Sequence, residues 1–127
     1  MTIRMLAWSV LLGLAYVFIA AGLATQQRGL KWNAGNRDAV SAPLTGVAAR
    51  AARASANFLE TFGFFAAAAL AVTVTQRDTP HATLGAELYF WARVVYLPIY
   101  LAGIPYLRTA VWAVSLWGML QVLEALL

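Results

Sequence analysis

Three polar side chains recur at helical spacing within residues 46–76, a stretch that is otherwise rich in alanine. At 100° per residue, Arg53, Asn57 and Glu60 fall within an arc of about 60° on one helix face. Charged groups cost a few kcal/mol or more inside a membrane, so they rarely face lipid and usually mark a cavity or a functional site. This face therefore predicts a polar site within an apolar bundle.

A second polar face occurs within residues 83–102. Arg93, Tyr96 and Tyr100 also fall within an arc of about 60°. If the two helices run antiparallel, Glu60 and Arg93 lie at a similar depth. We therefore expect a buried ion pair between Glu60 and Arg93.

The charges near these two faces do not balance. Arg53, Arg93 and Arg108 bring positive charge, and Glu60 alone brings negative charge. A guanidinium can donate two parallel hydrogen bonds to a carboxylate, so a small molecule with carboxylate groups would neutralise the excess. The sequence thus predicts a site for an anionic small molecule.

Four apolar segments must position these residues. Residues 5–25 carry no charge and are long enough to cross a hydrocarbon core of about 30 Å. A cleaved signal peptide is a weaker interpretation, because its apolar region would span only about 7 to 15 residues. We expect an all-α membrane protein, with residues 1–127 forming a single four-helix transmembrane domain whose helices lie at about 4–25, 46–76, 83–102 and 106–126.

Positive charges are distributed unevenly between the two ends of such a bundle. One end would carry Arg28, Lys31, Arg37, Arg50, Arg53 and Arg108, and the other only Arg4 and Arg77. The positive-inside rule places the richer end in the cytosol. We therefore expect a multi-pass protein with both termini away from the cytosol.

The overall composition excludes several classes of protein. Of 127 residues, 62% are apolar and 11% are charged, against about 25% charged in soluble domains. The net charge of +4 is scattered among apolar runs, so we expect no nucleic-acid partner. With no cysteine and a single histidine, His81, the chain offers no Cys or His cluster for a metal.

Three separated motifs resemble the MAPEG family, the membrane-associated proteins in eicosanoid and glutathione metabolism. Residues 53–61 (RASANFLET) are similar to the family's helix-two signature. Residues 93–100 (RVVYLPIY) and 103–109 (GIPYLRT) are similar to its helix-three and helix-four patterns. The resemblance covers residues 50–112 and suggests a bacterial-type member, in an inner membrane.

The resemblance implies a homotrimer that binds glutathione, as a co-substrate, between neighbouring protomers near the cytoplasmic side. Arg108 would stand beside the thiol and favour the thiolate, and Thr109 would donate a further hydrogen bond. The implied activity is that of a glutathione transferase or peroxidase acting on hydrophobic electrophiles that arrive through the bilayer. The implied glutathione-binding residues are Arg53, Asn57, Glu60, Arg93, Tyr96 and Tyr100, with Glu60 taking the ammonium group.

The chain also departs from the family pattern. Ser55 stands where many members have histidine, and Trp112 stands where some synthases have tyrosine. Two other functions stay open. One is a catalytically silent MAPEG-like membrane protein. The other is a small exporter of lipophilic cations that uses Glu60 as its deep carboxylate.

Overall fold

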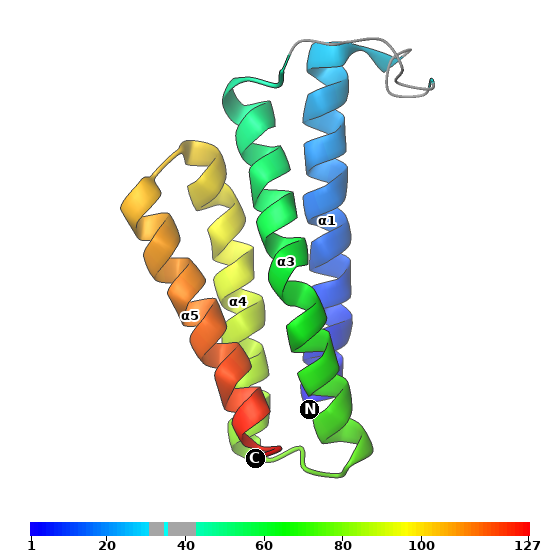
Figure 1. Ribbon diagram of the computed structural model, residues 1–127, viewed down its shortest axis with the longest axis vertical. Helices are drawn as coiled ribbons and strands as arrows, with labels where there is room; N and C mark the ends of the chain where they lie inside the picture. The colour runs from blue at the N-terminus through cyan, green and yellow to red at the C-terminus, as the bar shows by residue number, and fades with distance from the viewer. Residues whose placement is uncertain (31–34, 36–42) are drawn as a thin grey trace.

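The fold is an antiparallel arrangement of four long helices. The computed structural model describes residues 1–30, 35 and 43–127. Its helices are α1 (Thr2–Arg28), α3 (Gly46–Val74), α4 (Pro80–Ala102) and α5 (Pro105–Glu124). This confirms the expected all-α, four-helix fold, whereas Lys31 and Arg37 lie outside the described residues. The end of α1, the start of α3 and the α4–α5 turn share one end of the molecule, and both chain termini lie at the other (Figure 1).

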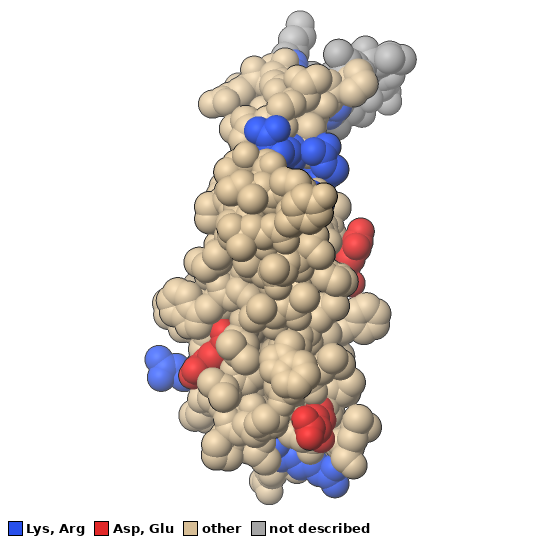
Figure 2. Space-filling model, turned by 90° about the vertical axis from the view of Figure 1, so that its left-hand side faces the viewer, with Lys and Arg blue, Asp and Glu red and all other residues tan. Residues whose placement is uncertain are grey.

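Two of these helices have the length and composition of membrane spans. Among the described residues, α1 and α3 are long and apolar enough to cross a membrane. They expose large apolar side chains such as Phe18 and Phe64, as a lipid-facing surface does. On the face in Figure 2, one group of Lys and Arg lies toward the top, others lie at the lower left and at the bottom, and the broad surface between them carries few charges. Transmembrane passage of α4 and α5 stays a prediction.

The helix α4 begins earlier than the sequence predicts. It starts at Pro80 rather than near residue 83. The hydroxyl of Thr79 accepts a hydrogen bond from the backbone N–H of Ala82 at 3.0 Å, which caps the helix. Pro80 occupies the first turn, where its missing N–H is not needed. The segment that joins α3 to α4 is therefore shorter than residues 77–82, which lie between the two predicted helices, because α4 already begins at Pro80.

Asp78 ties this turn to the start of α1. Its carboxylate accepts hydrogen bonds from the backbone N–H of Thr2 at 3.0 Å and from the Thr2 hydroxyl. The Thr83 hydroxyl donates a third at 3.0 Å. Burial by itself would raise the pKa of Asp78, but the hydrogen bonds from Thr2 and Thr83 outweigh it, so the pKa is lowered.

Two arginines stabilise helix ends. Arg50 Nε donates a hydrogen bond of 2.9 Å to the carbonyl of Leu101 in the last turn of α4. At the other end of the bundle, Arg77 donates one of 3.0 Å to the carbonyl of Leu126, just beyond α5. Positive groups at these positions satisfy free carbonyls and complement the negative end of the helix dipole.

Helices α4 and α5 make a backbone-to-backbone approach at two glycines. A Cβ atom added to Gly118 would lie 2.5 Å from the carbonyl oxygen of Gly85, and one added to Gly85 would lie 2.6 Å from the carbonyl oxygen of Gly118. Any side chain at either position would force the helices apart. This approach fixes the α4–α5 pair, from which most of the candidate site is built.

Candidate functional site

Five of the eight predicted site residues line one hollow among α3, α4 and α5. Its volume is about 320 Å³. Arg53, Glu60 and Arg93 are the three predicted residues that do not line it. The residues that do are Asn57, Tyr96, Tyr100, Arg108, Thr109 and Trp112.

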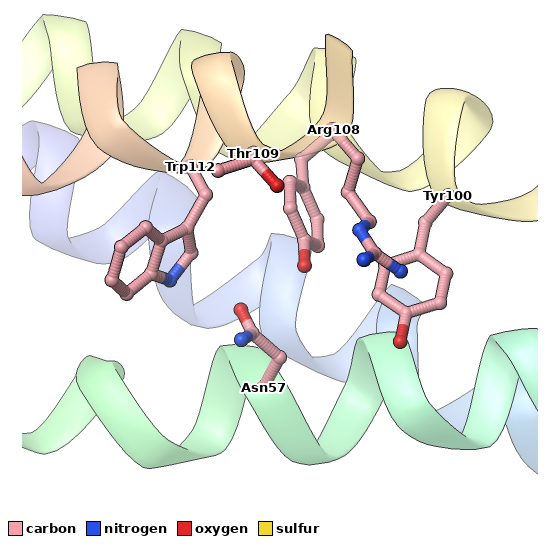
Figure 3. A pocket seen from close by; sticks show the side chains of 6 residues that line it. Asn57, Tyr100, Arg108, Thr109 and Trp112 are labelled. Carbon is pink, nitrogen blue, oxygen red and sulfur yellow. The ribbon is translucent and has the colours of Figure 1, made fainter. Parts of the chain in front are cut away.

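The side chains approach the hollow from opposite sides. Asn57 reaches up from α3 toward α5, and the indole nitrogen of Trp112 faces it (Figure 3). The Arg108 guanidinium lies over the ring of Tyr100, with its carbon 4.7 Å from the ring centroid. Thr109 follows Arg108 in α5, and its hydroxyl donates a hydrogen bond of 3.2 Å to the carbonyl of Pro105 in the same helix. The lining therefore combines one fixed positive charge with hydroxyl, amide and indole groups.

The hollow offers mainly hydrogen-bond donors. Among the described residues its lining has no carboxylate, and it includes the Arg108 guanidinium and the phenol groups of Tyr96 and Tyr100. The indole N–H of Trp112 is buried and has no hydrogen-bond partner among the described residues. Such a set of donors favours binding of an anionic ligand that carries several oxygen or sulfur acceptors.

Arg93 is completely buried beside this hollow. It donates a hydrogen bond of 2.9 Å to the amide oxygen of Asn57. Its guanidinium carbon lies 4.5 Å from the ring centroid of Tyr96, 5.2 Å from that of Phe58 and 5.8 Å from that of Tyr16. Aromatic rings thus surround the charge. Its Nε and second terminal nitrogen have no hydrogen-bond partner in the described part of the chain.

The expected ion pair between Arg93 and Glu60 is wrong. Glu60 is exposed, and the salt bridge found among the described residues joins His81 to Glu124, 3.6 Å apart. The buried face of α3 passes through Phe58. Glu60 follows two residues later, about 200° around the helix, and so points away from the bundle. Spacing placed Glu60 correctly relative to Asn57, but it did not reveal where the centre of the buried face lies.

Arg53 shares the outward position of Glu60. It is exposed and does not line the hollow. The three arginines therefore occupy three environments in this single chain: Arg93 is buried, Arg108 lines the hollow, and Arg53 lies on the outer surface. An exporter built around Glu60 loses support, because this carboxylate lies on the surface rather than inside the four-helix bundle.

Two aromatic residues that pack around Arg93 were not predicted. The Tyr16 hydroxyl donates a hydrogen bond to the backbone carbonyl of Arg93, and the Tyr16 ring lies 4.7 Å from that of Phe58, centroid to centroid. Both side chains are 1% exposed. A tyrosine in the middle of the uncharged residues 5–25 was the available signal, because a buried phenol needs a hydrogen-bond partner.

Comparison with known proteins extends the resemblance to nearly the whole chain. The sequence model of the MAPEG family matches residues 5–125, which include most of every helix and all residues of the hollow. Comparisons with curated proteins and with solved structures find no match.

Proposed function

Because the chain belongs to the MAPEG family, we propose that it is a membrane-embedded glutathione transferase or peroxidase acting on hydrophobic electrophiles. The family includes such enzymes and also members with other roles, so membership alone does not select the activity. The observation that carries the proposal is the donor-rich hollow beside a buried guanidinium.

Glutathione matches the chemistry of this hollow. It carries two carboxylates, one ammonium group and a thiol, so it needs several donors and one acceptor. Arg108, Tyr96 and Tyr100 supply donors, and the amide of Asn57 is held in place by Arg93. In this proposal Arg93 is a positioning residue, since it acts on the ligand through Asn57.

Catalysis would depend on Arg108. A positive charge beside the thiol favours the thiolate over the thiol. The Thr109 hydroxyl would donate a hydrogen bond to the sulfur by giving up its 3.2 Å hydrogen bond to the carbonyl of Pro105. The thiolate would then attack the electrophile and form a carbon–sulfur bond as the leaving group departs. With a peroxide, the thiolate would attack the terminal oxygen. The O–O bond would break, the alkoxide would take up a proton and leave as the alcohol, and the sulfenic acid left on the sulfur would condense with a second glutathione to give the disulfide and water.

A homotrimer would explain the two predicted residues that point outward. Arg53 and Glu60 are charged and exposed on the outer face of α3. Facing lipid would be costly for them, so a protein neighbour is the expected environment. We propose that they complete the glutathione site of an adjacent protomer, with Glu60 receiving the ammonium group.

The chain is an integral membrane protein, as its apolar helices and family membership indicate. We propose that it lies in a bacterial inner membrane, with both termini away from the cytosol. The end that would face the cytosol carries Arg28, Arg50 and Arg53. The hollow lies toward that same end, where glutathione is available.

Calorimetric titration of the purified protein with glutathione and with an S-alkyl glutathione tests this proposal. We expect both to bind, and Glu60→Gln to weaken binding by removing the partner of the ammonium group. Glu124→Gln, at the far end of the bundle, should leave both affinities unchanged. If neither compound binds to correctly assembled protein, the proposal is wrong.

Turnover separates the enzyme from a catalytically silent relative that still binds glutathione. We expect Arg108→Ala to abolish conjugation of an aryl halide and reduction of a hydrophobic peroxide while the trimer persists. Normal turnover by the assembled variant would refute the role of Arg108. Binding without turnover by the unaltered protein would identify the silent relative.

A further inference from the structure

A second hollow lies between α1 and α4, away from the candidate glutathione site. Its volume is about 420 Å³, and it is lined by Met5, Trp8, Glu87, Phe90 and Trp91. On α4, Glu87 precedes Tyr100 of the first hollow by about 20 Å of helix. The second hollow therefore lies toward the opposite end of the bundle, where the chain termini are (Figure 1).

The lining of this second hollow combines one negative charge with aromatic rings. Glu87 is exposed and forms no ion pair within the described residues. Trp8 and Trp91 are 51% and 59% exposed, so their rings are accessible, and Phe90 stands edge-on to Trp91 with 5.1 Å between centroids. A carboxylate flanked by aromatic rings attracts organic cations through charge and through the ring quadrupoles.

An apolar hollow adjoins this one along α4 and α5. Its volume is about 280 Å³, and its exposed lining is entirely apolar. Trp91 lines both hollows, so the two are neighbours that share this side chain. From Trp91 the apolar hollow continues past Val95 to Val111 and Val114 on α5. A ligand that fills both hollows would have a positive group with an apolar chain attached directly to it.

We propose that these two hollows together bind a lipophilic ammonium ion, with the ammonium group at Glu87 and the alkyl chain along α4 and α5. The absence of positive charge from both linings favours this ligand over a zwitterionic phospholipid. No Lys, Arg or His lines either hollow in the described part of the chain, so a lipid phosphate would lie near Glu87 without a positive partner in the lining itself.

The competing interpretation is an aromatic belt. Trp8 and Trp91 could anchor the helices at the membrane interface without any ligand. A belt does not depend on Glu87, so the response to removing this carboxylate separates the two interpretations. Arg4 lies one helical turn before Trp8 and forms no salt bridge with Glu87. As a nearby positive charge, it should oppose the binding of a cation.

Calorimetric titration with decyltrimethylammonium tests the proposal on the full-length protein in a neutral maltoside detergent. Partition of the probe into micelles is the same for all variants, so it cancels in their comparison. We expect saturable binding that weakens about tenfold in Glu87→Gln. Arg4→Gln should strengthen binding, and Glu124→Gln, which removes a carboxylate at the same end, should leave it unchanged.

Chain length tests the apolar half of the site. We expect affinity to rise by up to about fourfold per methylene until the hollow is filled, and then to level off. Equal affinity of the unaltered protein and Glu87→Gln would overturn the proposal in favour of the belt. Competition by phosphatidylcholine, but not by phosphatidylglycerol, each added as mixed micelles with the same maltoside, would also overturn it, by identifying a zwitterionic lipid as the occupant.

The proposed cation site does not depend on the proposed enzyme activity. Glu87 lies outside the candidate glutathione site. We therefore expect glutathione affinity to be the same in Glu87→Gln and the unaltered protein. A coupled loss of both affinities would overturn the proposal of an independent cation site, whereas failure of glutathione binding alone would leave the cation titration interpretable.

Discussion

The charge of Arg108 is expected to set the pKa of a glutathione thiol bound in the hollow. A guanidinium about 4 Å from a thiolate contributes about 4 kcal/mol at an effective dielectric constant of about 20. Arg108 is half-buried, so solvent screens part of this energy. We expect the net effect to lower the thiol pKa by about 1 to 2 from its usual value near 8.5. Such a change raises the thiolate fraction at pH 7 by about 8-fold to 25-fold.

The near-ultraviolet absorbance of the thiolate, titrated against pH with glutathione bound, measures this pKa directly. In Arg108→Ala the pKa should return by about 1 to 2 toward 8.5. Arg108→Lys should keep part of the effect, since it retains a positive charge but loses the planar fork. Arg4→Gln, at the other end of the bundle, is the matched control and should not change it. If Arg108→Ala binds glutathione with the same thiol pKa as the unaltered protein, the electrostatic reasoning is refuted.

Three further predictions concern the scaffold. Asn57→Leu removes the hydrogen-bond partner of the buried Arg93, so it should lower the free energy of unfolding in detergent by about 2 to 4 kcal/mol; unchanged stability would contradict this. Gly118→Ala should destabilise the α4–α5 pair by about 2 kcal/mol or more in the same assay, whereas Gly63→Ala, at an exposed helical position with nothing within 4 Å, should not. The pKa of Asp78 lies below its ordinary value of 3.8. The ionised carboxylate therefore stabilises the fold above pH 3.8, and this stabilisation is lost as the pH falls through the folded-state pKa. In Asp78→Asn, the free energy of unfolding should fall less over this pH range than in the unaltered protein.

The sequence alone determined the helices and most of the residues that gather at the site. Uncharged runs and alanine-rich stretches predict long helices whatever their neighbours are, because helix hydrogen bonds are local. Spacing also placed Asn57 on one polar face, and Tyr96 with Tyr100 on another. The turn at Gly103 and Ile104 set Arg108 in the first turn of the last helix. These features depend only on residues close together in the chain.

The tertiary structure alone decided which side of each helix is buried. The rotation of α3 turns Glu60 outward, so Arg93 is held by Asn57 and aromatic rings instead of by a carboxylate. Tyr16 contacts Arg93 from α1, 77 residues away in sequence. Periodicity gives the angles among residues of one helix, but the rotation of that helix against its neighbours depends on packing between distant segments. That packing also brings Trp8 beside Glu87, which no local pattern contains.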